Sequence, residues 1–246
     1  MPFGGFDGVL GGCEALVIPA PGEAPALVQT PPAPAVPDAH AVRLRVVLAQ
    51  DGGAELEGAL TWSGASASEL RDALEPADAL QRRQGFERLL SRQFPGLVVE
   101  DLAAVAEDEP EQPFEIRWKG RAPGVARPSA DGGLEIDAPL FPFMLTATYG
   151  QVGTRQLPLL VEREPVAQRI EVVAPAGLEL AASSPRQVET PYGRYRRVEK
   201  VTGQALVREE QLELSRSRIP PERYPAFAGF AASIDSLQQE PVRLTR

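Results

Sequence analysis

Apolar and polar residues alternate along much of the chain, the pattern of strands that bury one face. The clearest case is the pair of segments 41–48 and 55–62, in which residues such as Val42 and Leu56 alternate with charged side chains. The intervening residues 50–53, Gln-Asp-Gly-Gly, have the composition of a turn. The pattern predicts a β-hairpin with one buried face.

After this hairpin the apolar positions recur at helical spacing. Ser66 and Glu69 fit a capping box, so we expect a short helix that ends at Pro76. A second helix is predicted from about residue 78 to residue 93. Near the end of the chain, the prolines at 220–221 predict the first turn of a C-terminal helix.

The remaining alternating or apolar segments predict about ten further short strands. Those beyond the first hairpin are 97–100, 114–118, 134–136, 157–161, 170–173, 178–181, 186–190, 195–200, 205–215 and 242–244. This sum predicts a mainly β protein: an antiparallel β-sandwich with a two-helix insertion after the first hairpin and a C-terminal helix.

The domain organisation follows from composition. Residues 1–40 are rich in proline and glycine, with one strand-like run at 15–18, which favours an extended arm. Residues 41–246 are predicted to form one β-sandwich domain, with a sub-boundary near 150–168 as the alternative. We expect the chain to be the end piece of a longer protein, because it begins with an extended arm rather than with a compact element.

Composition narrows the classes of partner. The 246 residues are 43% hydrophobic and carry a net charge of −9. A nucleic-acid partner is disfavoured, because phosphate binding needs a basic surface. No apolar run reaches the roughly 18 residues of a membrane-spanning helix, so we expect no membrane span.

The chain has one cysteine, Cys13, and one histidine, His40. A zinc cluster of Cys and His ligands therefore cannot be assembled, and a Cys-His dyad requires that these two residues meet. The acidic loop 107–111 lacks the spaced ligands and glycine of a calcium loop. We expect no catalytic residues, no metal ligands and no cofactor in this chain.

Arginines at positions 82, 83, 88 and 92 fall on the polar face of the second predicted helix, away from Phe86. They allow a basic binding site, but the favoured interpretation is a solvated helix surface.

Six short segments carry a resemblance to a known family. They are 11–18 (GGCEALVI), 28–31 (VQTP), 51–54 (DGGA), 172–177 (VVAPAG), 192–195 (YGRY) and 219–227 (IPPERYPAF). Their order resembles the C-terminal β-rich region of bacterial transglutaminase-like proteins, members of the papain-like cysteine peptidase superfamily that carry an N-terminal β domain of unknown function. In that family the Cys-His-Asp core precedes the matched region, so Cys13 is not in the catalytic position.

The resemblance implies a non-catalytic accessory module that packs on or positions a transglutaminase-like core lying outside this chain. It also implies export to the periplasm or cell envelope, although no signal peptide is present in the chain and a cytoplasmic location stays open. One alternative is a structural protein–protein tile of a bacterial envelope assembly. A third is an autonomous glycosidase that uses a carboxylate pair.

Overall fold

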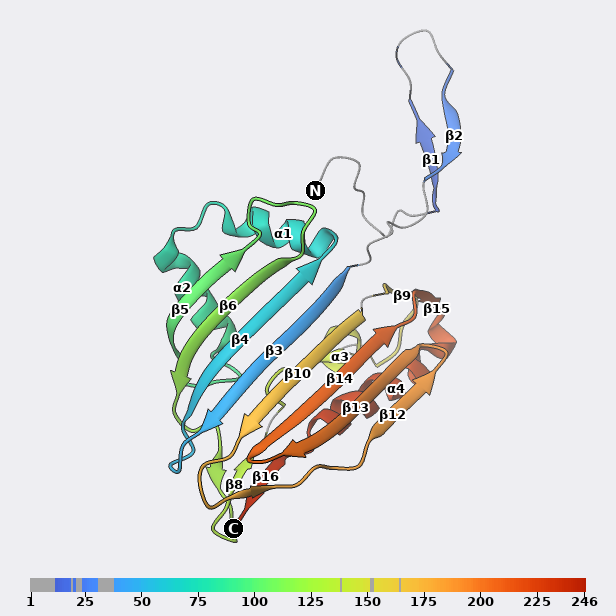
Figure 1. The fold of residues 1–246 in the computed structure, drawn as a ribbon. Coiled ribbons are helices and arrows are strands. Elements are labelled where there is room, and N and C mark those ends of the chain that lie inside the picture. The colour runs from blue at the N-terminus through green and yellow to red at the C-terminus, as the bar shows by residue number, and fades with distance from the viewer. Residues whose placement is uncertain are drawn as a thin grey trace.

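The structure is a computed structural model that describes residues 12–18, 20, 24–30, 38–137, 139–150, 153–163 and 165–246 (Figure 1). Its strands, in chain order, are β1 (Glu14–Val17), β2 (Ala26–Gln29), β3 (Ala39–Leu48), β4 (Ala54–Ser63), β5 (Val98–Val105), β6 (Phe114–Ala122), β7 (Arg127–Pro128), β8 (Leu134–Ile136), β9 (Leu159–Val161), β10 (Pro165–Val173), β11 (Glu179–Leu180), β12 (Arg186–Thr190), β13 (Gly193–Thr202), β14 (Ala205–Leu214), β15 (Ser217–Ile219) and β16 (Val242–Thr245). Its helices are α1 (Ala65–Leu74), α2 (Ala79–Leu90), α3 (Leu145–Tyr149) and α4 (Tyr224–Gln238), with a 3₁₀ turn, η2 (Pro221–Arg223), before α4. The predicted mainly β sandwich, with two helices inserted after a hairpin and a helix near the C-terminus, is confirmed.

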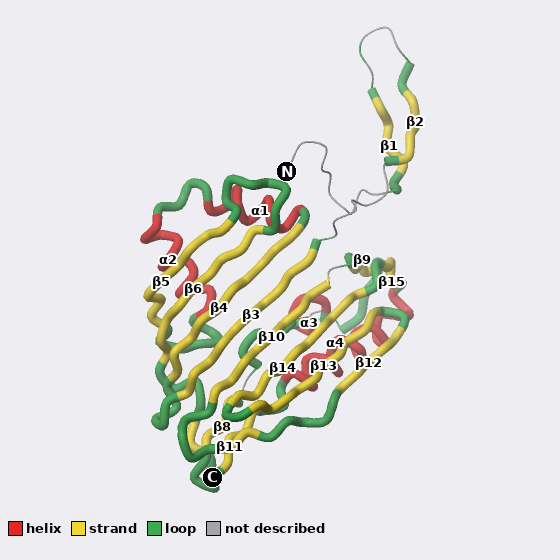
Figure 2. The backbone as a smooth tube through the Cα atoms, in the orientation of Figure 1, coloured by secondary structure: helices red, strands yellow, loops and turns green. Residues whose placement is uncertain are grey.

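An eight-stranded sheet organises the molecule, in the order β12-β13-β14-β10-β3-β4-β6-β5. Its neighbouring strands are antiparallel except for β3 and β10, which pair in parallel. Figure 2 shows the helices behind this sheet. On β3, Val42 and Val46 face the helix side and are buried, whereas Arg43 and Arg45 point to the opposite, open face.

A second layer completes the sandwich. It is a four-stranded sheet in the order β11-β16-β8-β7, which lies near the ends of β3 and β10 in Figure 1. Ile136 of β8 and Leu244 of β16 are buried in the same apolar cluster as Ile170 and Val172 of the large sheet. The two sheets therefore share one core.

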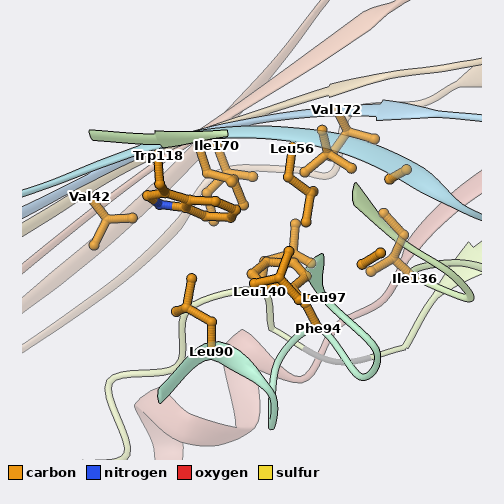
Figure 3. Close-up of a cluster of buried hydrophobic side chains, with 14 of the residues drawn as sticks. Val42, Leu56, Leu90, Phe94, Leu97, Trp118, Ile136, Leu140, Ile170 and Val172 are labelled. Atoms are coloured by element: carbon orange, nitrogen blue, oxygen red, sulfur yellow. The ribbon is translucent and has the colours of Figure 1, made fainter. Parts of the chain in front are cut away.

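Trp118 of β6 belongs to this cluster and lies against the large sheet (Figure 3). Its side chain is buried, and its ring centroid is 5.7 Å from that of Phe86 and 6.1 Å from that of Phe94. Both phenylalanines come from the two-helix insertion and the loop that follows it, so the insertion is held to the sheet by aromatic packing.

The indole of Trp118 fits because the residue opposite it on β4 is Gly58. A Cβ atom at position 58 would lie 2.2 Å from the indole Nε1. Real Cβ atoms do not approach another heavy atom this closely, and the obstacle is a buried ring in a packed core. Glycine is therefore required at this position of the strand.

A second cluster covers the other half of the sheet and centres on α4. Phe227 and Ile234 of this helix are buried with Leu212 of β14 and Tyr195 of β13. These positions follow the helical period and the strand alternation that the sequence predicts.

Buried polar groups also join α4 to the sheet. The Tyr195 hydroxyl donates to Glu210 at 2.5 Å, and the Gln238 amide donates to the other oxygen of Glu210 at 3.3 Å. Burial and the charge of Glu210 raise the pKa of Tyr195, so the phenol stays protonated and remains a donor. Arg197 pairs with Glu240, just beyond the end of α4.

The capping box predicted at Ser66 and Glu69 is wrong. Helix α1 begins at Ala65, its N-cap is Gly64 with φ of 71°, and no side chain of the N-cap binds the first turn. Instead, the Asp38 carboxylate accepts the Ala65 amide at 2.5 Å. Asp38 directly precedes the strand that pairs with the end of β4, so a residue distant in sequence supplies the cap.

The predicted extended arm, residues 1–40, needs partial correction. Within it, Ala26–Gln29 also forms a strand and pairs with β1 in an antiparallel hairpin. Strand β3 begins at Ala39, two residues before the predicted domain start. Residues 1–11, 19, 21–23 and 31–37 of the arm lie outside the described residues. The assignment of residues 41–246 to one domain stays a prediction.

Among the described residues, no helix is long and apolar enough to cross a membrane.

Replacing Gly58 by alanine should lower the free energy of unfolding by about 1–3 kcal/mol, because the added methyl group overpacks the core against Trp118. Urea unfolding followed by tryptophan fluorescence measures the change. The matched control is Gly85→Ala in α2, where a Cβ atom meets nothing within 4 Å. That variant should be unchanged or stabilised by up to about 1 kcal/mol, since alanine favours helix. Equal effects at the two positions would contradict the proposed packing constraint.

Candidate interaction surfaces

The β1–β2 hairpin exposes large apolar side chains. The exposed fraction is 61% for Leu16, 80% for Ile18 and 73% for Leu27, and Val17 and Val28 are also exposed. Figure 1 shows this hairpin extending away from the eight-stranded sheet. We call these five residues the apolar arm.

Both faces of the hairpin are apolar. Leu16 lies opposite Leu27 on one face, and Ala15 lies opposite Val28 on the other. A strand with one face in water alternates apolar and polar residues, whereas a strand covered on both faces reads as a continuous apolar run. An isolated two-stranded hairpin is also only marginally stable in water. The hairpin therefore has the sequence of an element that is covered on two sides.

The open face of the eight-stranded sheet is instead covered with paired charges. One row of opposed residues crosses five neighbouring strands and alternates in sign: Glu171, Arg45, Glu57, Lys119 and Asp101. Arg45 pairs with Glu171 at 3.3 Å, and Lys119 pairs with Glu57 at 3.2 Å. Opposite charges on neighbouring strands stabilise a sheet modestly. They also explain how so wide a face remains in water without apolar cover.

Glu115 of β6 is the most connected carboxylate of this part of the face. It accepts hydrogen bonds from Arg43 at 3.2 Å and from Thr61 at 3.1 Å, and a third from Arg117. Burial by itself raises the pKa of Glu115. The hydrogen bonds from Arg117 and Thr61 and the two arginine charges outweigh burial, so the pKa lies below its ordinary value.

A hollow of about 660 Å³ lies on the open face where β3 begins. Its lining includes the small side chains Ala41 and Ala167 and the polar side chains Gln187, Arg196 and Gln211. Its volume falls in the range of about 300–1,000 Å³ that is usual for small-ligand sites. The hollow is therefore the second candidate surface, after the apolar arm.

Cys13 and His40 lie in different parts of the molecule. Cys13 is exposed beside Thr30 on the hairpin, where its backbone amide donates to the Thr30 hydroxyl at 2.9 Å. His40 lies in β3 and stacks on Trp62 with the ring centroids 5.1 Å apart. Burial lowers the pKa of His40, so the ring is neutral at pH 7, and its Nε2 has no hydrogen-bond partner among the residues that the structure describes.

The acidic loop 107–111 is held by arginines. Arg71 of α1 donates to the backbone carbonyls of residues 106, 109 and 112, and Arg82 of α2 pairs with Glu107 at 2.7 Å. The prediction that Arg82 belongs to a solvated helix surface is therefore wrong, because only 23% of its side chain is exposed. The described residues contain no group of three or more His, Cys, Asp or Glu side chains that is positioned to hold a metal ion. The expectation of no metal or cofactor stays a prediction.

Two features of these candidate surfaces were not predicted from the sequence. The run Ala26–Gln29 is short, but prolines flank it and three of its four residues are apolar, so a paired strand was detectable. The surroundings of Arg196 left no signal in the sequence, because they depend on the pairing of β13 with β12 and β14.

Comparison with known proteins finds a domain in the second half of the chain. Residues 136–244 match a family described as a domain of unknown function with a solved structure, DUF3858. The match runs from the end of β8 into β16, and the strands β3 to β6 lie outside it. No curated protein matches the chain.

One solved structure is similar to the chain at 10% sequence identity. It is the crystal structure of a two-domain M1 zinc metallopeptidase mutant bound to L-arginine, with a TM-score of 0.26. The similarity covers 85% of this chain and 42% of that one, so this chain spans less than half of that protein.

Replacing Glu115 by glutamine should lower the free energy of unfolding at pH 7 by about 1 kcal/mol, because its arginine partners are largely exposed and water screens their charges. The pKa of Glu115 is lower in the folded chain than in the unfolded chain, so the contribution is present above the ordinary value of 4.5. It is lost as the pH falls through the folded-state pKa. Thermal unfolding between pH 7 and pH 3 should show the two proteins converging at low pH.

The control for this experiment is Glu55→Gln. Glu55 points to the same open face from β4. Arg121 lies opposite it on β6, but Glu55 forms no ion pair with the described residues. A Glu55→Gln protein that loses as much stability as Glu115→Gln would contradict the role of Glu115.

Proposed function

We propose that this chain is a non-catalytic accessory module of a transglutaminase-like protein. Its apolar arm docks on a catalytic core that lies outside this chain. The observation that carries the proposal is the hairpin whose two faces are both apolar and both exposed. Apolar surface gathered in this way is typical of a protein–protein interface.

The placement of Cys13 and His40 supports a non-catalytic role. Acyl transfer by a cysteine needs a thiolate beside a histidine that takes its proton. His40 instead stacks on Trp62 inside the sheet, while Cys13 is exposed on the hairpin. With one residue of each kind in the chain, no second pair is available.

The choice of a transglutaminase-like core rests on the resemblance of the six short segments to that family. The same resemblance supports an exported, periplasmic or envelope location. The DUF3858 match adds a family for residues 136–244 and, as a domain of unknown function, names no partner.

The DNA upstream of this chain tests the proposal first. We expect a reading frame, fused or neighbouring, that encodes a core with Cys, His and Asp in transglutaminase order. The absence of such a frame would contradict the proposed partner. Symmetric self-association of this chain without any core would favour the envelope tile instead.

The double substitution Leu16→Ser, Leu27→Ser should weaken the complex with that core at least tenfold, since several buried aliphatic side chains are worth more than 1.4 kcal/mol together. Co-expression followed by size-exclusion chromatography and titration measures the affinity. The control is Leu89→Ser in α2, because Leu89 is as exposed as Leu16, at 61%, and lies outside the arm. Loss of the complex with Leu89→Ser, or its survival in the double variant, would contradict docking through the arm.

A further inference from the structure

The hollow on the open face contains a row of directly opposed residues that differs from the charged rows beside it. From β12 to β4 the row reads Gln187, Arg196, Gln211, Ala167, Ala41 and Thr61. It has an arginine between two carboxamides and, next to them, two side chains that are single methyl groups. The small side chains leave room above the sheet at the point where the hydrogen-bonding groups gather.

Arg196 differs from the other arginines of the open face. Those at positions 43, 45, 117, 121, 169 and 194 each form an ion pair with a glutamate. Within the described chain, Arg196 has no ion-pair partner, although its side chain is exposed on the same face. Its opposed neighbours are the uncharged residues Gln187 and Gln211.

The nearest carboxylates on β14 are already engaged. Glu213 accepts from Arg163 at 2.9 Å and also pairs with Arg194, and these contacts hold its pKa below the ordinary value. Glu209 pairs with Arg169. On β12, Glu189 lies opposite Arg194 rather than Arg196. The register therefore leaves the Arg196 guanidinium without a carboxylate partner among the residues that the structure describes.

The geometry points to a binding site for a peptide carboxylate. We propose that an acidic side chain of a protein partner enters the hollow and accepts hydrogen bonds from the Arg196 guanidinium. The amide groups of Gln187 and Gln211 are placed on either side to donate as well, and the peptide backbone passes over Ala167 and Ala41. A planar guanidinium recognises a carboxylate through two parallel hydrogen bonds, which gives both strength and direction.

The position of the hollow favours a protein as the source of the carboxylate. Its lining includes Ala39, the first residue of β3, and it therefore lies at the end of the sheet from which the chain leads back to the hairpin. Figure 1 shows the hairpin at this same end of the sheet. A partner held by the apolar arm would reach the hollow. In this respect the inference rests on the proposed function.

The test uses two peptides that differ in one group, acetyl-Ala-Glu-Ala-amide and acetyl-Ala-Gln-Ala-amide. Each is titrated into the isotopically labelled chain while backbone amide shifts are followed by NMR. We expect saturable shifts at residues 167, 196 and 211 with the Glu peptide, and binding of the Gln peptide weaker by roughly tenfold, as for a lost charge-assisted hydrogen bond. Equal binding of the two peptides, or no saturable shift in the millimolar range, would overturn the site.

Arg196→Gln should reduce binding of the Glu peptide to that of the Gln peptide, and Arg196→Lys should retain part of it, because the charge remains while the fork of donors is lost. Neither variant should change the thermal unfolding midpoint. The control is Arg83→Gln in α2, an arginine without an ion-pair partner among the described residues, and it should bind as the unchanged chain does. Equal losses at positions 83 and 196 would show nonspecific charge attraction and would overturn the proposal.

These outcomes are separate from those of the proposed function. If the peptide binds through Arg196 but the arm variants keep their affinity for the core, the carboxylate site stands and arm docking fails. If the arm variants lose the core but the peptides do not bind, arm docking stands and the carboxylate site fails.

Discussion

The parallel ladder between β3 and β10 is the constraint on which the rest of the structure depends. Parallel neighbours cannot be joined by a tight turn, so the chain between them must leave the sheet and return. Here that intervening chain builds one flank of the sheet, the helices α1, α2 and α3, and part of the second layer. The chain after β10 then builds the other flank. Pairing of residues 166–173 with residues 40–47 therefore joins two antiparallel units into one sheet.

The ladder also determines what lies on the open face. Because Ala167 is in register with Ala41, the small side chains of the two flanks meet at the seam and form the floor of the hollow. A slip of one residue would turn these methyl groups to the opposite face. The carboxylate site that we infer is thus a product of the register of the whole sheet rather than of one loop.

The two faces of the large sheet differ in how they are accommodated, one by burial and the other by pairing of charges. The covered face is mostly apolar, with a few buried polar groups paired to one another or to α4, and is buried by helices and by the smaller sheet. The open face remains in water because nearly all its arginines are matched to glutamates on neighbouring strands. Against this background the apolar arm is the exception, since its leucines have neither cover nor charge. Its exposure is the observation on which the proposed docking to another protein rests.

Much of the fold could be predicted from the sequence, because apolar and polar residues alternate strictly along strands that bury one face, as in residues 42–48. Helix α2 was likewise evident from the spacing of Phe86 and Leu90. The cap of α1 was not, because Asp38 reaches it only after β3 and β4 have paired. The parallel pairing of β3 with β10 left no local pattern either. The candidate site therefore could be predicted only in part: the hydrophobic run of β1 was visible, but the neighbours of Arg196 depend on long-range register.

Hydrogen–deuterium exchange of this chain, alone and in complex with the proposed transglutaminase-like core, tests the central claim most directly. We expect the backbone amides of residues 14–18 and 26–29 to exchange rapidly in the isolated chain and to become protected in the complex. Protection confined to other surfaces, with the hairpin amides exchanging as fast as before, would contradict the account.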